Sequence, residues 1–194
     1  MSAINRRRLL GLAGAGLVLA ALPARAQSLT ADGAERPTEG AVRRNVSGFR
    51  RIDWRDHFDS LGVVTLIADT RSRALSYWSA DGSDHRIYPT SVPISEELTR
   101  RGHTRVVRKR VGPDWTPTPS MVARNPDLRY MPPGPDNPLG THAMYLGWPA
   151  YLIHGTHDTR KIGRPSSDGC IGLYNEMIEE VFAITPVGAR VLIL

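Results

Sequence analysis

Cysteine is almost absent from this chain of 194 residues, because Cys170 is the only one. One thiol cannot form an internal disulfide, so a disulfide-stapled scaffold is excluded. The sequence also has no internal repeat, which excludes repeat architectures. In an oxidising compartment a lone thiol is either buried and inert or exposed for a chemical reason. The position of Cys170 among Gly and Ser residues favours the second interpretation.

Acidic residues are missing from the first 26 positions, which hold four of the 25 basic residues. The rest of the chain therefore has 21 basic against 19 acidic side chains. The formal net charge of +6 thus belongs mostly to the N-terminus. Nucleic-acid binding needs a concentrated basic face, and this composition gives no reason to expect a nucleic-acid partner.

The N-terminal segment 1–26 has the three parts of an export signal. Arginines at positions 6 to 8 precede an apolar run, and Ala24 and Ala26 are small residues at the positions that a signal peptidase reads. Cleavage near Ala26 would leave Gln27 first and predicts a periplasmic protein. The consecutive arginines resemble a twin-arginine signal, with a general secretory signal as the alternative.

An uncleaved membrane anchor is the other interpretation of this segment. Its apolar run covers residues 9–22, a length of 14 residues. A helix that crosses a bilayer needs ~20 apolar residues. We therefore expect no stable membrane span after the signal is cleaved.

The remaining chain divides into a spacer and one domain. Residues 27–60 are mostly polar and are interrupted by Gly and Pro, which predicts a leader or spacer. Residues 61–194 are enough for one domain with a sizeable core. Short apolar runs alternate there with turn signals such as Asp81–Gly82, a pattern that predicts a mostly β domain. Strands are expected in VVTLIAD, ALSYW, HRIYPTSVPI, HTRVVRKRVG, THAMYLG, AYLIHG and ARVLIL.

Two further segments interrupt this strand pattern. Residues 113–140 hold more than half of the fifteen prolines, too many for a helix or a central strand, and predict a long ordered loop or short edge pieces. Near the C-terminus, Asn175 is a good helix N-cap and Glu176 suits the positive end of a helix. An apolar stripe at helical spacing follows, and Pro186 would end the helix.

The residues around the lone cysteine could supply the parts of a nucleophilic site. A catalytic thiol needs a base, a group that orients the base, and donors for an oxyanion. His154 stands at the end of a predicted strand, and Ser167 to Cys170 form a tight turn in which Gly169 frees the backbone. Spacing alone leaves open that Cys170 is a small buried hydrophobe. His154, His157 and Cys170 would also be three metal ligands, but no fourth ligand is evident, and we expect no metal.

Several linked motifs narrow these alternatives. The stretches NPLGTHAMYLG, YLIHGT, IGRPSSDGCIGLYNE and VGARVLIL resemble, in order and spacing, the catalytic domain of the YkuD-type L,D-transpeptidases. The resemblance covers roughly residues 63–194. It implies a β-sandwich with mixed sheets and one or two short helices beside the active site. It also implies an exported, cofactor-free cysteine acyltransferase that acts on peptidoglycan stem peptides, as donor and as acceptor, in cell-wall cross-linking.

The resemblance also assigns roles to residues. Cys170 would be the nucleophile and His154 the general base, with the carbonyl of Gly155 orienting the ring. The N–H groups of Gly169 and Cys170 would line the oxyanion hole. An attacked peptide bond would become a thioester at Cys170, which an amine then resolves.

Two positions depart from the family's pattern. Asp168 stands where a His usually precedes the Gly-Cys pair, and a carboxylate there disfavours a thiolate unless it points away or pairs with a base. Gly172 stands where Arg or Asn is usual, which removes an anchor for a substrate carboxylate. Arg164, Lys161 or Arg160 would take the place of this anchor. Ser167, Trp148 and Tyr130 are the other residues proposed for substrate binding. Together with Trp115 and Met131, the last two would form an apolar wall.

Three functions from different classes follow from these residues. The first is a transpeptidase that links stem peptides or attaches another protein to them. The second passes the same acyl-enzyme to water, as an L,D-carboxypeptidase or amidase. The third, suggested by Asp168 and Gly172, is a non-catalytic wall-binding module.

Overall fold

The computed structural model describes residues 50–194, so the predicted signal peptide and most of the predicted spacer lie outside the described residues. Within 50–194, no helix is long and apolar enough to cross a membrane. The strands are β1 (Thr65–Asp69), β2 (Ala74–Trp78), β3 (His85–Pro89), β4 (Val92–Pro93), β5 (Gly102–Val111), β6 (His142–Leu146), β7 (Leu152–His154), β8 (Pro165–Ser167), β9 (Ile171–Gly172) and β10 (Arg190–Ile193). The helices are α1 (Pro119–Arg124) and α2 (Asn175–Ile184), with 3₁₀ turns η1 (Trp54–Asp56) and η2 (Thr159–Lys161).

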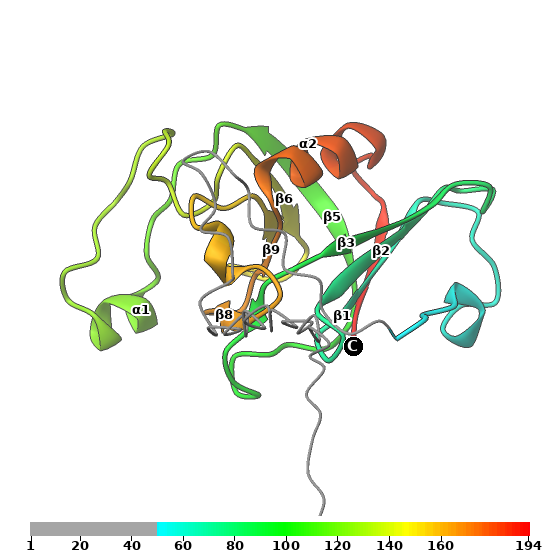
Figure 1. Cartoon of the computed structure of the whole chain (residues 1–194), viewed down its shortest axis with the longest axis horizontal. Coiled ribbons are helices and arrows are strands. Elements are labelled where there is room, and N and C mark those ends of the chain that lie inside the picture. Colours follow the sequence, from blue (N-terminus) through cyan, green and yellow to red (C-terminus); the bar gives the residue numbers. More distant parts are fainter. Residues whose placement is uncertain (1–49) are drawn as a thin grey trace, which may run out of the picture. The chain divides into compact units, whose positions relative to one another are not determined.

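Eight of these strands form one mixed sheet in the order β3-β2-β1-β10-β5-β6-β7-β9 (Figure 1). The neighbours β1 and β10, and β7 and β9, are parallel, whereas the other pairs in this sheet are antiparallel. Strands β4 and β8 form a separate parallel pair. The predicted mostly β fold with mixed pairing and few short helices is confirmed, and its two layers are the two halves of a curled sheet that share the long strand β5.

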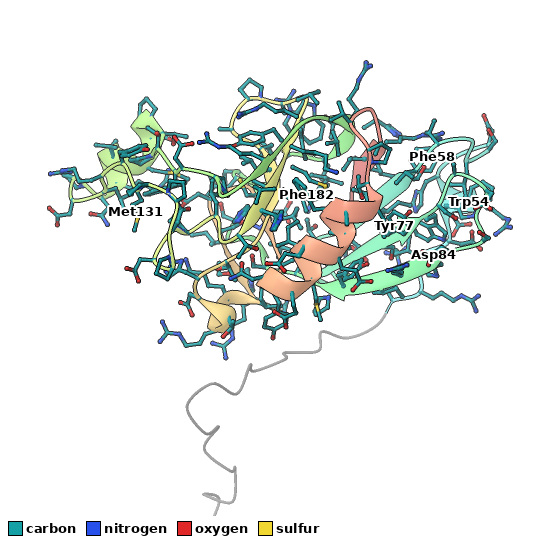
Figure 2. The ribbon with its side chains drawn as sticks, turned by 90° about the horizontal axis from the view of Figure 1, so that it is seen from above. Trp54, Phe58, Tyr77, Asp84, Met131 and Phe182 are labelled. Carbon is teal, nitrogen blue, oxygen red and sulfur yellow. The ribbon has the colours of Figure 1, made fainter. Side chains whose placement is uncertain are left out.

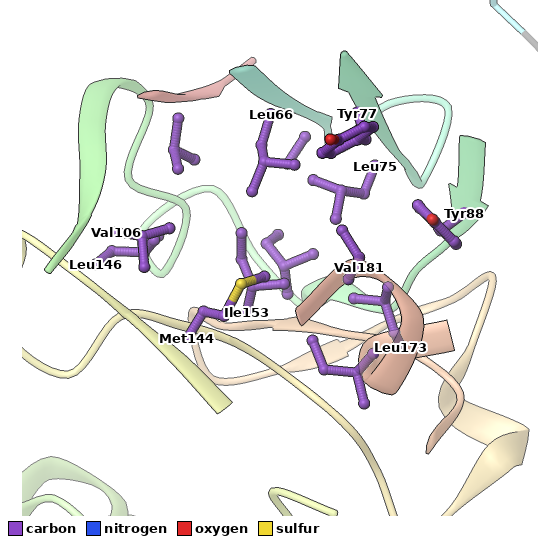
Figure 3. Close-up of a cluster of buried hydrophobic side chains, with 14 of the residues drawn as sticks. Leu66, Leu75, Tyr77, Tyr88, Val106, Met144, Leu146, Ile153, Leu173 and Val181 are labelled. Carbon is purple, nitrogen blue, oxygen red and sulfur yellow. The ribbon is translucent and has the colours of Figure 1, made fainter. Parts of the chain in front are cut away.

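The main core lies between the two halves of the sheet. Leu66 and Leu75 on β1 and β2 face Met144 and Ile153 on β6 and β7, and all four are fully buried (Figure 3). Fully burying a side chain of this size contributes about 1.5–3 kcal/mol relative to leaving it exposed. The apolar stripe predicted for helix α2 packs against the same cluster, in which Ile178 and Val181 are buried. This core therefore fixes β7, which carries the candidate base, relative to the rest of the sheet.

A second cluster covers the other end of the molecule. Ile52 is buried there against Ile67 and Trp78, and Trp54 and Phe58 pack at its edge. In Figure 2, Trp54 and Phe58 lie at the opposite end from Met131. The last residues of the segment 27–60 thus contact the sheet.

The proline-rich segment 113–140 is more ordered than a loop. Trp115 and Met131 form an isolated antiparallel bridge. This bridge brings together the two ends of the loop formed by residues 116–130. The prediction that the prolines leave no helix here is wrong, because α1 forms. Pro119 occupies the first helical position, where its missing N–H costs nothing, and the Thr118 hydroxyl caps the Met121 N–H.

Asn175 begins α2 but does not cap it, which corrects the predicted N-cap. The cap residue is Tyr174, which makes no side-chain cap hydrogen bond. The Asn175 Oδ1 instead accepts hydrogen bonds from the backbone N–H groups of Thr141 and Thr156, each at 3.2 Å. Asn175 therefore ties α2 to the segment that follows His154. The predicted end of the helix is confirmed, since α2 stops at Ile184, two residues before Pro186.

Candidate active site

Parallel pairing of two short strands brings the candidate base and nucleophile together. In the register of β7 and β9, Ile153 is opposite Ile171, and His154 is opposite Gly172. His154 ends β7, and Cys170 immediately precedes β9. Residues that are sixteen positions apart in the chain thus become neighbours at one edge of the sheet, and both line the same cavity.

This cavity has a volume of about 350 Å³ and two chemically different walls. The proline-rich segment supplies the apolar wall, which consists of Trp115, Met121, Leu128, Met131, Pro138 and Leu139, with Asp136 at its edge. Residues 154–170 and one earlier serine supply the polar wall, which consists of Ser91, His154, Thr156, His157, Lys161, Ser166, Ser167, Asp168 and Cys170. Such a cleft suits a ligand with both apolar and peptide-like polar parts.

His154 is held in the form that a general base requires. Its side chain is 9% exposed, and its Nδ1 lies 2.5 Å from the carbonyl oxygen of Gly155. A carbonyl only accepts, so Nδ1 carries the proton and Nε2 is the ring's free acceptor. Burial lowers the pKa of His154 to about 4, and the nearby Lys161 charge acts in the same direction against the Gly155 hydrogen bond. The ring is therefore neutral at pH 7.

Cys170 is partly exposed, and its sulfur is close to backbone groups of Ala150 and of Leu152 at the start of β7. The thiol donates to the carbonyl oxygen of Ala150 at 3.4 Å. Desolvation raises the pKa of the Cys170 thiol to about 11, with the Asp168 charge adding to the rise and the Leu152 N–H opposing it. The resting site thus contains a thiol and a neutral imidazole, and the thiol's hydrogen bond goes to Ala150 rather than to His154.

Glycine is required at position 169, just before Cys170. Gly169 has φ +132°, a backbone conformation that L side chains rarely adopt. A Cβ there would lie 3.4 Å from Tyr151 Cζ, so the turn packs directly on that ring. The Gly169 N–H, predicted to serve the oxyanion hole, is directed at the Ser167 hydroxyl at 3.4 Å, and this hydroxyl donates to the Cys170 carbonyl at 2.6 Å.

Asp168 is neutralised by a residue far away in the chain. The Arg124 guanidinium of α1 donates to its carboxylate at 2.5 Å, across a separation of 44 residues. The carboxylate two residues before Cys170 is thus paired with a base, one of the two conditions under which it is compatible with a thiolate.

Gly172 is explained by packing against Ser91. The two residues form an isolated antiparallel bridge, with the Ser91 N–H donating to the Gly172 carbonyl at 2.8 Å. A Cβ on Gly172 would come within 2.4 Å of the Ser91 Oγ and 3.7 Å of the His154 Cε1. A larger residue at 172 is therefore excluded while Ser91 keeps this position, and Ser91 itself lines the cavity.

The other predicted residues divide into those that meet at the cavity and those that do not. Ser167, Lys161, His157, Trp115 and Met131 line it. Arg164 is exposed, Tyr130 is 57% exposed, and Trp148 packs against Tyr151 and the Arg100 guanidinium, so these three are not part of the cavity wall. In residues 50–194 no group of three His, Cys, Asp or Glu side chains could hold a metal ion.

Sequence reasoning missed several residues that shape this site. Ser91, Arg124, Ala150 and Asn175 contact or position it, yet each acts through a hydrogen bond or a backbone atom. Asn175 also explains the glycine after the base, since a Cβ on Gly155 would lie 2.3 Å from the Asn175 Oδ1. No sequence motif marks these residues. The only signal for them is their closeness in the fold to His154 and Cys170, whose chemistry was predicted.

Comparison with known proteins agrees with this arrangement. Residues 64–193 match the family model of the L,D-transpeptidase catalytic domain, YkuD. The chain belongs to this family. A putative L,D-transpeptidase of Fuscovulum blasticum, encoded in the ATP synthase subunits region, is 63% identical over 193 residues, which is 98% of each chain. The predicted family is thereby confirmed.

Some more distant relatives of this L,D-transpeptidase family member are larger proteins. The probable L,D-transpeptidase YbiS of Escherichia coli is 46% identical over 136 residues, and the match covers 67% of this chain but 43% of YbiS. The chain thus matches less than half the length of that relative. Among solved structures, L,D-transpeptidase 3 of Mycobacterium tuberculosis, in complex with a faropenem-derived adduct, superposes with a TM-score of 0.53 at 18% identity, over 68% of this chain and 60% of that one. At this identity the likeness establishes the fold.

Proposed function

We propose that this family member is an exported L,D-transpeptidase that acts on peptidoglycan stem peptides through a thioester at Cys170. The observation that carries the proposal is the pairing of β7 with β9. It places Cys170 and His154 at one cavity, while the Gly155 carbonyl fixes the ring with Nε2 free to accept a proton. This arrangement supports the proposal, because candidates for a nucleophile, a base and a group that orients the base lie together.

The first half-reaction begins with the thiol. Turning the Cys170 side chain away from the Ala150 carbonyl toward His154 lets Nε2 take the thiol proton as the sulfur attacks the donor carbonyl. The sulfur–carbon bond forms and the carbonyl becomes a tetrahedral oxyanion. The Cys170 N–H, with Gly169 N–H released from the Ser167 hydroxyl, would stabilise this charge. The imidazolium then gives its proton to the leaving amine as the peptide bond breaks, which leaves a thioester.

The second half-reaction reverses these proton movements. An acceptor amine attacks the thioester carbonyl, and the neutral His154 takes its proton. The new amide bond forms as the carbon–sulfur bond breaks, and the thiolate recovers the proton from His154. If water takes the place of the amine, the product is a trimmed stem peptide, which is the hydrolase reaction. No ATP is needed, because the energy of the original peptide bond is kept in the thioester.

A protonated resting thiol also suits an exported protein. Thiolates are the forms that oxidise most readily, and the raised pKa of Cys170 keeps the thiolate scarce until substrate is bound. The N-terminal arginines and apolar run support export with cleavage near Ala26. The mass of the protein recovered from a periplasmic fraction tests this step, and a chain that retains residues 1–26 would contradict it.

Incubation of the mature protein with a disaccharide-tetrapeptide tests the reaction. We expect cross-linked dimer and released D-alanine, identified by mass spectrometry, and a thioester on Cys170 in the acid-quenched enzyme. Released D-alanine without dimer would assign the hydrolase reaction. Binding without any turnover would assign the wall-binding module, and the transpeptidase proposal would be wrong.

A further inference from the structure

The polar wall of the cavity carries a buried hydroxyl that the proposed acyl transfer does not use. Ser91 is 4% exposed and lines the cavity. Its backbone bonds to Gly172, but among residues 50–194 its hydroxyl has no hydrogen-bond partner. A hydroxyl so far removed from bulk water normally finds a partner, because leaving it unpaired costs free energy. The Ser91 hydroxyl therefore points to a polar group of a ligand in the cavity.

This hydroxyl lies beside the edge of the His154 ring. A Cβ on Gly172 would be 2.4 Å from the Ser91 Oγ and 3.7 Å from the His154 Cε1, so the two atoms are separated by no more than the sum of these distances. Cε1 is bonded to Nε2, the atom that would pass a proton to the leaving amine. A group held by the Ser91 hydroxyl would thus lie close to that amine.

Lys161 adds a positive charge to the same side of the cavity. It is half-buried and is the one Lys or Arg among the described residues that line the cavity. Within residues 50–194 its ammonium forms no ion pair, either with Asp136 and Asp168 of the cavity or with any other carboxylate. Its charge lowers the pKa of His154 and is not among the causes that shift the pKa of Cys170. The ammonium therefore lies on the side of the base.

The backbone brings Ser91 and Lys161 together on this wall. The Gly163 N–H donates to the Thr90 carbonyl at 3.0 Å, which pairs the residue before Ser91 with the second residue after Lys161. Ile162, between Lys161 and this bond, is fully buried and anchors the segment. A donor that enters the cavity therefore meets a hydroxyl and an ammonium from two braced segments.

A carboxylate is the group that these two side chains fit best. Its oxygens only accept, so one can take the hydroxyl proton while the other faces the ammonium. The proposed reaction brings such a group to this place. In the released D-alanine, the leaving amine and the carboxylate are attached to the same carbon. When the amine is at the His154 Nε2, the carboxylate is a few bonds away, within reach of Ser91 and Lys161.

We propose that Ser91 and Lys161 bind the carboxylate of the residue that leaves from the donor. This inference rests on the proposed transpeptidase function and adds the groups that place the leaving residue for its proton. The site also has an effect on the base. A bound carboxylate would offset the Lys161 charge, which lowers the pKa of His154. The base would thus become stronger when a donor with a free carboxylate is in place.

Two matched donors test the proposal. A disaccharide-tetrapeptide and its C-terminal amide differ by one charge, which is on the leaving residue. Release of D-alanine or of D-alaninamide, measured by mass spectrometry, gives kcat/KM for acylation. Hydrogen bonds to a charged group in a half-buried site predict that the wild type prefers the carboxylate donor by about 10- to 100-fold. Lys161→Gln should lose most of this preference and Ser91→Ala part of it, whereas Lys161→Arg keeps the charge and should keep most of it.

The two neighbouring arginines provide matched controls. Arg160 is exposed and bonded to Asp158, and Arg164 is exposed outside the cavity wall. Arg160→Gln and Arg164→Gln remove the same charge as Lys161→Gln from the same segment, and both should keep the donor preference. Thermal unfolding of each variant establishes that it is folded at the assay temperature.

The pH profile separates the charge of Lys161 from a merely structural role. With the amide donor, the acid limb of kcat/KM reports the base of the free enzyme. Lys161→Gln removes a charge that lowers the pKa of His154, so this limb should move to higher pH. Ser91→Ala changes no charge and should leave the limb in place. A limb that stays in place in Lys161→Gln would contradict the closeness of Lys161 to the base.

The outcomes distinguish this site from the function on which it rests. Equal rates with the two donors in the wild type, with product released from both, would overturn the carboxylate site alone. A preference that survives in Lys161→Gln, or that is lost equally in Arg160→Gln, would overturn it as well. A folded wild-type enzyme that releases neither product would overturn both proposals.

Discussion

Arg124 on α1 and Asp168, two residues before Cys170, form an ion pair with a 2.5 Å hydrogen bond. The pair joins the proline-rich segment to the turn that carries Cys170, on opposite walls of the cavity. It also offsets the one nearby carboxylate that raises the pKa of the thiol. The position of the proline-rich segment and the pKa of the Cys170 thiol are thus linked through one contact.

Replacing Arg124 by Gln should slow the reaction of Cys170 with a β-lactam of the penem type. The unpaired Asp168 carboxylate would raise the pKa of Cys170 further, and a partly exposed charge changes such a rate by about two- to fivefold. Asp168→Asn should have the opposite effect, and the double variant should resemble Asp168→Asn. The measurement is the pH dependence of adduct formation, followed by intact mass.

The Asp168→Asn variant distinguishes this electrostatic role from a purely mechanical one. If Arg124 only holds the segment in place, Asp168→Asn would break the same contact and would slow the reaction as Arg124→Gln does. Equal slowing in both single variants would therefore contradict the proposed effect on the thiol. Arg129→Gln is the matched control, because Arg129 lies on the same segment and donates only to backbone carbonyls.

Cys170→Ala should lower the rate of transfer by about a thousandfold or more, because it removes the one thiol that would form the thioester. The side chain is only partly buried, so the variant should keep its unfolding temperature within a few degrees of wild type. Intact mass after incubation with donor provides the direct measurement. A persistent adduct on the alanine variant would show that Cys170 is not the nucleophile.

The buried His154 should make the protein less stable in mild acid. Its folded pKa is about 4, against 6.5 for the free side chain, so the unfolded chain binds a proton at higher pH than the folded one. Neutral His154 therefore contributes its full share to the free energy of unfolding above pH 6.5. This contribution is lost as the pH falls toward 4, and the total loss is about 3 kcal/mol. Urea unfolding at pH 7 and pH 4.5 measures it.

The matched variants for this experiment are His154→Gln and His157→Gln. His154→Gln lowers stability at pH 7 but should remove most of the extra loss between pH 7 and pH 4.5. His157 is exposed at the cavity, so its replacement should keep the wild-type pH dependence. An unchanged pH dependence in His154→Gln would mean that another group controls the acid sensitivity.

Asn175→Ala should destabilise the protein by about 2–4 kcal/mol, because the N–H groups of Thr141 and Thr156 both lose their acceptor. The second N–H lies two residues after His154, so transfer activity should fall more than stability alone explains. Asn175→Asp keeps an acceptor oxygen and should retain most of the stability and most of the transfer activity. Activity measured well below the unfolding temperature separates the two effects, and an active, stable alanine variant would contradict the bracing role.

The sequence was sufficient for the local features of this molecule and insufficient for its long-range partners. Alternating apolar runs predicted the strands, and the linked motifs predicted Cys170 and His154, because both signals reside in neighbouring residues. Asp168 looked unfavourable only because its partner, Arg124, is 44 residues away on a helix that the prolines seemed to forbid. Asn175 has good N-cap chemistry, but tertiary packing uses its amide oxygen elsewhere. Such contacts depend on which elements the fold brings together.

Gly172 provides the last test, because its apparent departure from the family's pattern is a packing requirement set by Ser91. Gly172→Ala should destabilise the protein by about 1–3 kcal/mol, since the new Cβ would lie 2.4 Å from the Ser91 Oγ. Adding Ser91→Ala removes that oxygen and leaves the Ser91 Cβ at 3.7 Å, an ordinary contact, so the double variant should recover most of the loss. Thermal unfolding of the two single variants and the double variant measures the coupling. Additive losses would mean that Gly172 is needed for its backbone conformation or for substrate access rather than for the space that Ser91 fills.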